Sequence, residues 1–237
     1  MKMYTVLVGN NIPDECREYF EKKGDRVILL PPFVRLQKGV STHADMLLFY
    51  DGKRLLMHRE YYASNKELFD SVGVEIITTD ETIREEYPND ILFNAVLTKD
   101  KVLYSKTEYT SAYIKNLSRE QVAVKQGYTA CSTCRVTDNA FITTDIGLYR
   151  AYTKDGIDCL LVSKEDIVLE GYGCGFIGGA TAVDRENVYF FGDLTKHSDY
   201  EKIKSFIEKY GKKIVRLGSF KLTDIGGAII IYNNINN

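Results

Sequence analysis

The chain has 237 residues, a formal net charge of −2 and a pI near 6.0, with acidic and basic residues interspersed. Because no basic stripe is present, nucleic acid is not expected as a partner, and no apolar run approaches the ~18 residues of a membrane span. Five cysteines without a framework spacing, and first residues that do not match a signal peptide, predict a protein of the reducing cytoplasm.

A short phrase recurs along the chain: a polar or small residue, an alanine, and then an apolar strand. Its recurrence at roughly 40 to 50 residues is typical of stacked or radially arranged supersecondary units. Equivalent positions of such units converge on one axis, so the phrase also predicts where a site would lie. The five copies are His43-Ala44, Asn94-Ala95, Asn139-Ala140, Gly179-Ala180 and Gly227-Ala228.

The first copy opens a unit with the order β-β-α-β. Residues 46–50 and 54–57 are apolar runs joined by Asp51-Gly52, a dipeptide that favours the positive φ angles of a tight hairpin turn. A helix is predicted over residues 61–71 and a returning strand over 74–78.

Later copies repeat this plan. In the fourth unit, apolar side chains at helical spacing follow a capping residue at Ser198 or Asp199, and Gly211 ends the helix before a strand over residues 213–217. The third unit is the shortest, and its helix is the least marked.

The fifth unit is completed by the N-terminus. Residues 228–232 form one strand, and the remaining strand, helix and strand are predicted within residues 3–30. Pairing of the last strand with the first would leave no exposed strand edge. We therefore predict an α/β fold: a five-bladed αβ-propeller of five ββαβ units in one domain, residues 1–237, closed by its own terminal strands.

This repeat pattern resembles that of the pentein, or guanidino-group-modifying enzyme, superfamily over the whole chain. Within it, the sequence resembles an uncharacterised, clostridial-type branch (DUF6873-like). The superfamily includes arginine and agmatine deiminases, dimethylarginine hydrolases, amidinotransferases and non-catalytic members. The resemblance implies a polar axial core in which a cysteine thiolate attacks a guanidinium carbon, a histidine acts as acid and base, and carboxylates hold the guanidinium. It also implies a homodimer.

The sequence departs from the superfamily pattern at two points. The superfamily nucleophile follows a glycine pair near the C-terminus, but after Gly226-Gly227 that place is taken by Ile230 or Ile231, which has no nucleophilic chemistry. The superfamily's mid-chain His-x-Asp is reduced to Asp138 without a histidine. The usual catalytic set is therefore incomplete.

Candidate catalytic residues occur in other units. An intact His-x-Asp is found at His43 and Asp45, and a neighbouring carboxylate can fix a histidine tautomer. Cys131 and Cys134 lead into the third copy, and Cys134 and Cys174 each precede their copy by the same interval. These thiols could form a catalytic thiolate, a redox C-x-x-C pair or a metal site, or could simply fill a tight core. With a single C-x-x-C, no metal site is predicted.

Acidic and amide side chains lie at or just before the repeated phrase. Several carboxylates facing one small cavity would favour a cation such as guanidinium, which binds carboxylates through paired hydrogen bonds. Alternatively, such residues form Asx turns just before the strands begin. The predicted ligand-binding residues are Asp90, Asn94, Asp138, Asn139 and Asp224.

Two functions from different classes follow. The first is a cysteine hydrolase or amidinotransferase acting on a guanidino or amidino compound. The alternative is a non-catalytic ring that binds a small cationic ligand or a protein partner. No cofactor is expected, because the glycine-rich residues 173–179 lack the Lys-Ser/Thr and long helix of a phosphate-binding loop. In the first function the nucleophile is Cys134 or Cys131, His43 is the acid or base, Asp45 orients His43, and Asp138 and Asp224 hold the cation.

Overall fold

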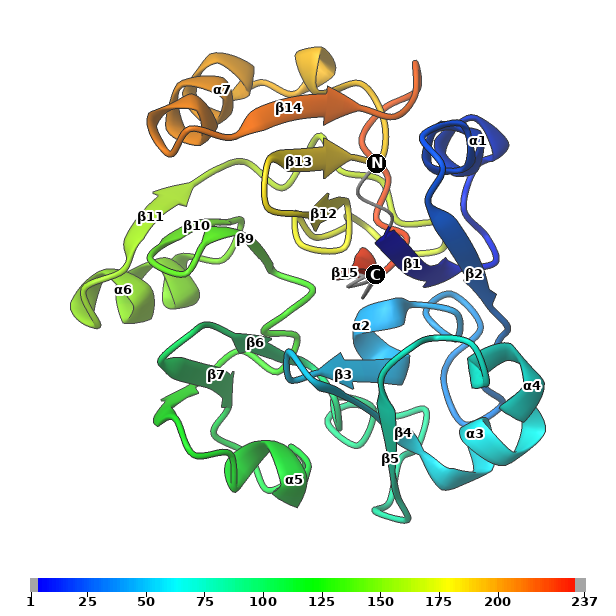
Figure 1. The fold of residues 1–237 in the computed structure, drawn as a ribbon. Coiled ribbons are helices and arrows are strands. Elements are labelled where there is room, and N and C mark those ends of the chain that lie inside the picture. The colour runs from blue at the N-terminus through cyan, green and yellow to red at the C-terminus, as the bar shows by residue number, and fades with distance from the viewer. Residues whose placement is uncertain (1–3, 233–237) are drawn as a thin grey trace, which may run out of the picture.

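The computed structural model describes residues 4–232, and fifteen strands within this range form five three-stranded sheets. The sheets are arranged around a central region, as predicted from the five repeats (Figure 1). The strands are β1 (Tyr4–Gly9), β2 (Arg26–Leu30), β3 (Leu48–Tyr50), β4 (Arg54–His58), β5 (Glu75–Thr79), β6 (Ala95–Leu97), β7 (Lys101–Ser105), β8 (Glu120–Val124), β9 (Thr133–Thr137), β10 (Ala140–Thr143), β11 (Asp158–Leu161), β12 (Thr181–Val183), β13 (Asn187–Phe190), β14 (Lys213–Arg216) and β15 (Ala228–Tyr232).

Every sheet has the same topology. Its first strand pairs antiparallel with the middle strand, and the middle strand pairs parallel with the third. An antiparallel pair can be joined by a tight turn, whereas a parallel pair needs a longer crossover, which accounts for the β-β-α-β order. The five sheets are β15-β1-β2, β3-β4-β5, β6-β7-β8, β9-β10-β11 and β12-β13-β14.

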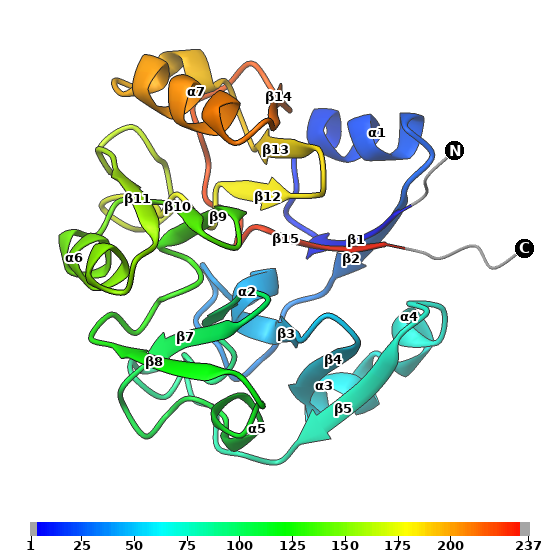
Figure 2. The same cartoon turned by 60° about the vertical axis from the view of Figure 1, so that its left-hand side comes forward.

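Helices occupy the crossovers and lie at the periphery, except for α2, which lies near the centre (Figures 1 and 2). The predicted helix over 61–71 is two short helices, because the chain leaves helical geometry at Asn65, whose side-chain amide donates to the Tyr61 carbonyl at 2.8 Å. None of the helices in the described range is long and apolar enough to cross a membrane. The helices are α1 (Asp14–Lys22), α2 (Ala44–Leu47), α3 (Arg59–Ser64), α4 (Lys66–Phe69), α5 (Ala112–Lys115), α6 (Ile146–Lys154) and α7 (Tyr200–Lys209), with a 3-10 turn at Leu194–Lys196.

The first and last strands of the chain lie side by side. β15 pairs antiparallel with β1, in a register that runs from Tyr4 opposite Tyr232 to Val8 opposite Ala228 (Figure 2). The fifth unit is therefore assembled from both ends of the chain, as the repeat pattern predicts. Residue 3, included in that prediction, lies outside the described residues.

The third unit differs from the prediction in register. Ala140 begins the middle strand β10, and Asp138 and Asn139 form the turn before it, whereas the first strand β9 already begins at Thr133. The alignment of Asn139-Ala140 with the other copies was wrong, because an apolar strand follows the turn just as it follows the phrase. Cys134 thus lies inside a first strand and is not equivalent to Cys174.

The first strands line a central channel of about 220 Å³. Each of β3, β6, β9, β12 and β15 contributes its first three residues to the channel wall. Most are apolar, because these strands are enclosed by the rest of the fold. At one end of the channel the chain segments that precede the first strands converge, and these segments carry the polar side chains described next.

Candidate functional site

Buried polar side chains gather at the end of the channel where the first strands begin. His43 precedes α2, Asn94 precedes β6, and Cys131 and Asp224 come from the loops before β9 and β15. Each of these four residues is less than 5% exposed. Four of the five units therefore contribute to one cluster, which is the convergence that the repeat predicts.

The side chain of Asn94 makes several of the hydrogen bonds that hold this cluster together. Its Oδ1 accepts hydrogen bonds from the backbone N–H groups of Ala130 (2.7 Å) and Cys131 (3.3 Å). Its Nδ2 lies 3.1 Å from the carbonyl oxygen of Asp45 and 2.9 Å from the Cys131 Sγ. One side chain thus fixes the loop before β9 against α2 and holds the thiol in place.

Replacing Asn94 by leucine is expected to destabilise the fold by about 3 kcal/mol, because buried backbone N–H groups left without an acceptor cost roughly 1–3 kcal/mol each. Asn139, which is exposed in the β9–β10 turn, is the matched control and should tolerate leucine within about 0.5 kcal/mol. Denaturant unfolding of both variants measures the two costs. Equal costs would show that Asn94 does not organise the cluster.

The Cys131 thiol lies between Asn94 and α2. Its Sγ is 3.9 Å from the Met46 sulfur, and it interacts with the Asp45 carboxyl. Burial, together with the charges of Asp45 and Asp224, raises the pKa of the Cys131 thiol well above its usual range. The thiol is therefore protonated at neutral pH and needs a base to become a nucleophile.

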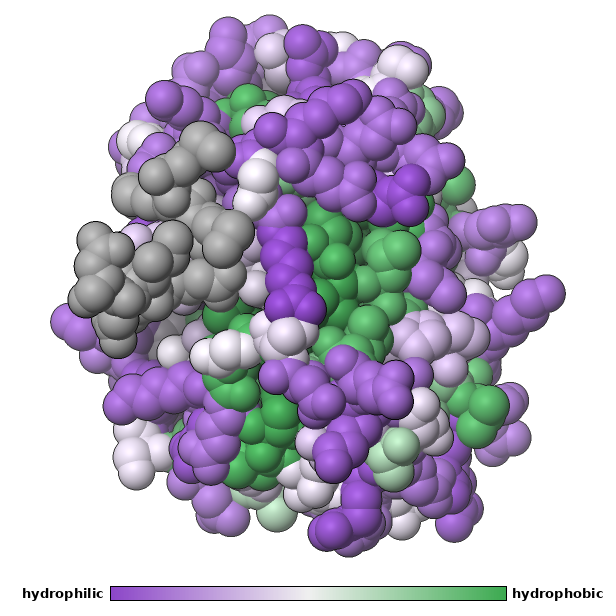
Figure 3. Space-filling model, turned by 45° about the vertical axis from the view of Figure 1, so that its right-hand side comes forward, coloured by the Kyte–Doolittle hydropathy of each residue, from purple (hydrophilic) through white to green (hydrophobic). Residues whose placement is uncertain are grey.

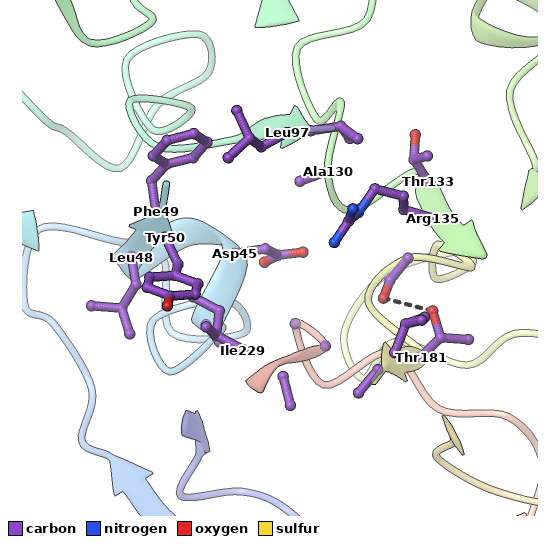
Figure 4. Close-up of a pocket in the computed structure, with 18 of the residues that line it drawn as sticks. Asp45, Leu48, Phe49, Tyr50, Leu97, Ala130, Thr133, Arg135, Thr181 and Ile229 are labelled. Atoms are coloured by element: carbon purple, nitrogen blue, oxygen red, sulfur yellow. Dashed lines mark hydrogen bonds between the residues drawn. The ribbon is translucent and has the colours of Figure 1, made fainter. Parts of the chain in front are cut away.

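Asp45 connects the buried cluster to the channel. It lies in the single turn of α2, lines the channel, and points toward Arg135 across it (Figure 4). Its Oδ1 is buried and has no hydrogen-bond partner among the described residues. Burial and the nearby Asp224 charge raise the pKa of the Asp45 carboxyl well above its usual range. A cation in the channel that carries N–H groups would donate the hydrogen bond that Asp45 Oδ1 lacks and would compensate the charge of the carboxylate.

His43 faces Asp224 rather than Asp45. Its Nδ1 is 3.8 Å from Asp224 Oδ1, and the Asp224 carboxyl also accepts from the N–H groups of Phe176 (2.8 Å) and Gly226 (3.0 Å). Burial lowers the pKa of His43 to about 4 and raises the pKa of Asp224 to about 6. At pH 7 the imidazole is neutral, and the carboxyl is mostly ionised.

The pKa of His43 predicts a pH dependence of stability. Because unfolding returns this pKa from about 4 to its ordinary 6.5, the unfolded state binds the extra proton between these values. The histidine's contribution to stability is therefore complete above pH 6.5 and is lost as the pH falls toward 4. We expect the stability difference between the wild type and His43→Gln to shrink over this window, by roughly 1.4 kcal/mol for each unit of pKa difference. Denaturant unfolding at several pH values measures it, and a constant difference would contradict this assignment.

The other residues that the sequence predicted for the site lie outside the buried cluster. Cys134 lines the channel wall from β9, and burial raises the pKa of its thiol to about 11. Asp90 is buried and accepts a hydrogen bond from the Tyr128 hydroxyl at 2.6 Å, and burial raises the pKa of this carboxyl as well. Asp138 pairs with Arg135 at 2.8 Å in an exposed turn. The structure therefore does not bring Asp138 and Asn139 to the cluster.

Arg135 and Met46 are residues that the sequence reasoning missed. Arg135 is the third residue of β9 and lines the channel. The correct register of the third unit would have revealed it, because each first strand places its third residue on the channel. Among residues 4–232, no three His, Cys, Asp or Glu side chains are placed to hold a metal ion, and all five cysteines are free thiols.

A comparison with protein families identifies the family of this chain. Residues 7–229 match a family described as a family of unknown function, DUF6873. The chain belongs to this family. A search of curated proteins finds no match.

Solved structures with the same fold are guanidino-modifying enzymes of the pentein superfamily. Agmatine deiminase from C. jejuni has a TM-score of 0.60 at 11% identity, with 99% of this chain and 94% of that chain covered. A mutant of DDAH from Pseudomonas aeruginosa complexed with citrulline has a TM-score of 0.57 at 11% identity, with 98% of this chain and 99% of that chain covered. An amidinotransferase from Microseira wollei has a TM-score of 0.54 at 12% identity, with 93% of this chain and 94% of that chain covered. At these identities the likeness establishes the fold: an α/β pentein-like fold of five three-stranded sheets.

Proposed function

We propose that this protein binds a small guanidinium or amidinium compound in the central channel and acts on it with Cys131 as the nucleophile. The observation that carries the proposal is the buried, unpartnered Oδ1 of Asp45, which lies on the channel and belongs to a carboxyl that contacts the Cys131 thiol. We further propose that the five units form one closed propeller domain, so that the site is enclosed on all sides.

The charge of the cluster favours a cation. Asp45 and Asp224 interact unfavourably with each other, and the imidazole of His43 is neutral at pH 7. Guanidinium and amidinium groups are planar cations that bind carboxylates through paired hydrogen bonds. The channel volume of about 220 Å³ is below the ~300 Å³ at which pockets for drug-sized ligands begin, so it suits a small group.

The proposed reaction uses the groups of the cluster in sequence. Once the bound cation has displaced the proton of Asp45, the Asp45 carboxylate accepts the proton of the Cys131 thiol, and the sulfur attacks the central carbon of the guanidinium, which gives a tetrahedral adduct. Asp45 returns this proton to the leaving nitrogen as one C–N bond breaks, so an amine or ammonia leaves and an S-linked thiouronium remains. Attack by water then breaks the C–S bond, releases a ureido product and returns the thiol. Asp224 holds His43, which can pass protons in the second step.

Turnover assays test this function. Arginine, agmatine and methylated arginines are incubated with the protein, and ureido product and released amine are measured. We expect product with at least one of these compounds, and none from Cys131→Ser, whereas Cys134→Ser should retain turnover. Absence of product from all of them would contradict the hydrolase proposal.

A non-catalytic binding function is the second candidate, and one observation favours it. Ile230 lines the channel near the place where the superfamily has its cysteine, and the Cys131 thiol is 4% exposed and protonated. In this case guanidinium compounds would bind without reacting. Calorimetry that detects saturable binding, together with unchanged ligand recovered after long incubation, would establish this alternative.

The homodimer stays a prediction. On the face drawn in Figure 3, hydrophobic side chains are exposed in more than one area among polar ones, which would suit contact with a second copy. Analytical ultracentrifugation at several protein concentrations measures the oligomeric state.

A further inference from the structure

The channel opens into a wide basin at the end opposite the buried cluster. The basin has a volume of about 1220 Å³ and shares the third residues of four first strands with the channel. These shared residues are Tyr50, Arg135, Val183 and Ile230. The basin is therefore the outer mouth of the channel and is chemically separate from the carboxyl-rich cluster at its other end.

Cationic side chains dominate the basin wall. Five cations line it, against the two carboxyl groups of Asp138 and Asp184. Both carboxyls already have partners in the chain, since Asp138 pairs with Arg135 and Asp184 accepts hydrogen bonds from Tyr189 (2.7 Å) and Asn187 (3.1 Å). The five cations are Arg26, Lys53, Arg135, Arg185 and Lys212.

Four of these cations have no carboxylate within ion-pair distance in the described part of the chain. Arg26 donates to the carbonyl oxygen of Ser71 at 2.7 Å, and the Lys212 ammonium donates to the carbonyl oxygen of Asp184. Arg185 stacks on the Tyr232 ring, with 4.5 Å from its guanidinium carbon to the ring centroid. The Lys53 ammonium makes no hydrogen bond or ion pair among residues 4–232. The basin thus holds uncompensated positive charge.

Arg135 and Lys212 both line the basin wall, and their positive charges oppose each other. Partial burial lowers the pKa of Lys212, and the Arg135 charge lowers it further despite the opposing effect of Asp184. Two like charges in a partly buried wall are unfavourable unless an anion lies between them, because screening by water is weaker there than at an open surface.

We infer that this basin is a binding site for an oxyanion, that is, a phosphate or carboxylate group held by Arg135, Lys212 and Arg185. Arginine guanidinium groups donate paired hydrogen bonds to such groups, and the Lys212 ammonium adds a point charge. The site goes beyond the proposed function and does not depend on it, since none of its residues belongs to the buried cluster.

Titration with inorganic phosphate and with malonate tests the site and distinguishes the two oxyanion types. Binding is measured by calorimetry and by the rise of the unfolding temperature, with the total ionic strength held constant by sodium chloride. We expect saturable binding of at least one of these anions. Lys212→Gln and Arg185→Gln should each weaken it about tenfold or more, which corresponds to about 1.4 kcal/mol.

Matched controls separate a site from a general charge effect. Lys196, like Lys212, donates to a backbone carbonyl, but from the 3-10 turn and outside the basin wall, and Arg59 pairs with Asp80 in an exposed position. Lys196→Gln and Arg59→Gln should leave binding unchanged. Arg185 is exposed, so its variant tests the site even if Lys212→Gln folds poorly. Absence of saturable binding, or equal losses in test and control variants, would overturn the inference.

Discussion

Replacing Gly226 by alanine is expected to destabilise the protein by roughly 3 kcal/mol or more. Gly226 has a φ of +79°, and a Cβ there would lie 2.2 Å from the Cβ of His43. The left-handed backbone costs a non-glycine residue about 1–2 kcal/mol, and overpacking adds about 1–3 kcal/mol. Because Gly226 also donates to Asp224, the substitution should displace the His43–Asp224 pair as well.

Gly156 provides the control for this substitution. Its φ is +80°, but nothing lies within 4 Å of a Cβ built at this position. Gly156→Ala should therefore lower the free energy of unfolding only by the cost of the left-handed backbone, about 1–2 kcal/mol. Denaturant unfolding of both variants measures the difference. If the two cost the same, the close approach of Gly226 to His43 would not be an energetic constraint.

Asparagine in place of Asp45 is expected to weaken the binding of guanidinium compounds by about 30-fold or more, because a buried hydrogen-bonded charge pair broken on one side typically costs about 2–5 kcal/mol. The affinity of the wild type should depend on pH. Burial raises the pKa values of Asp45 and Asp224, so the free protein holds protons on these carboxyls that a bound cation must displace. Affinity should therefore rise with pH, and the part of this rise that comes from Asp224 should lie near pH 6.

Calorimetry in buffers of different ionisation enthalpy measures both the affinity and the protons released. Asp138→Asn is the control, because Asp138 pairs with Arg135 in an exposed turn and should leave guanidinium affinity within about twofold. Unchanged affinity in Asp45→Asn, or affinity that falls as the pH rises, would contradict the assignment of Asp45 as the cation-binding group.

Local sequence signals predicted the elements of the fold well. Asp51-Gly52 lies in the loop that joins β3 to β4, as expected, and Gly52 has a φ of +95°. Asp51 has no positive φ, however, and the loop spans residues 51–53, so the turn is not the two-residue type that the dipeptide predicted. The pairing of β15 with β1 followed from the missing half of a repeat, since an incomplete unit at one end of the chain needs its partner at the other. Such predictions succeed because turn chemistry and strand periodicity are local properties.

The detailed geometry of the site depends on contacts between distant segments and was not predictable in the same way. The phrase at Asn139-Ala140 has the residue pattern of the other copies, but it is a hairpin turn, and only the pairing of β9 with β10 reveals the shift. Likewise, His43 and Asp45 are neighbours in sequence, yet the imidazole faces Asp224 from another unit. His43 is an extended residue that precedes α2, whereas Asp45 lies within the turn of α2, so their side chains point in different directions and the His-x-Asp motif does not form a contact pair.

Covalent labelling of Cys131 tests the central claim most directly. Chloroacetamidine carries the cationic group that the site is proposed to bind, and chloroacetamide carries the same leaving group without the charge. We predict that chloroacetamidine labels Cys131 selectively and faster than chloroacetamide does, and that Asp45→Asn removes this advantage while Cys134 stays unlabelled, as measured by peptide mass spectrometry. Equal rates for the two reagents at Cys131, or no adduct at Cys131, would contradict a cation site beside a reactive thiol.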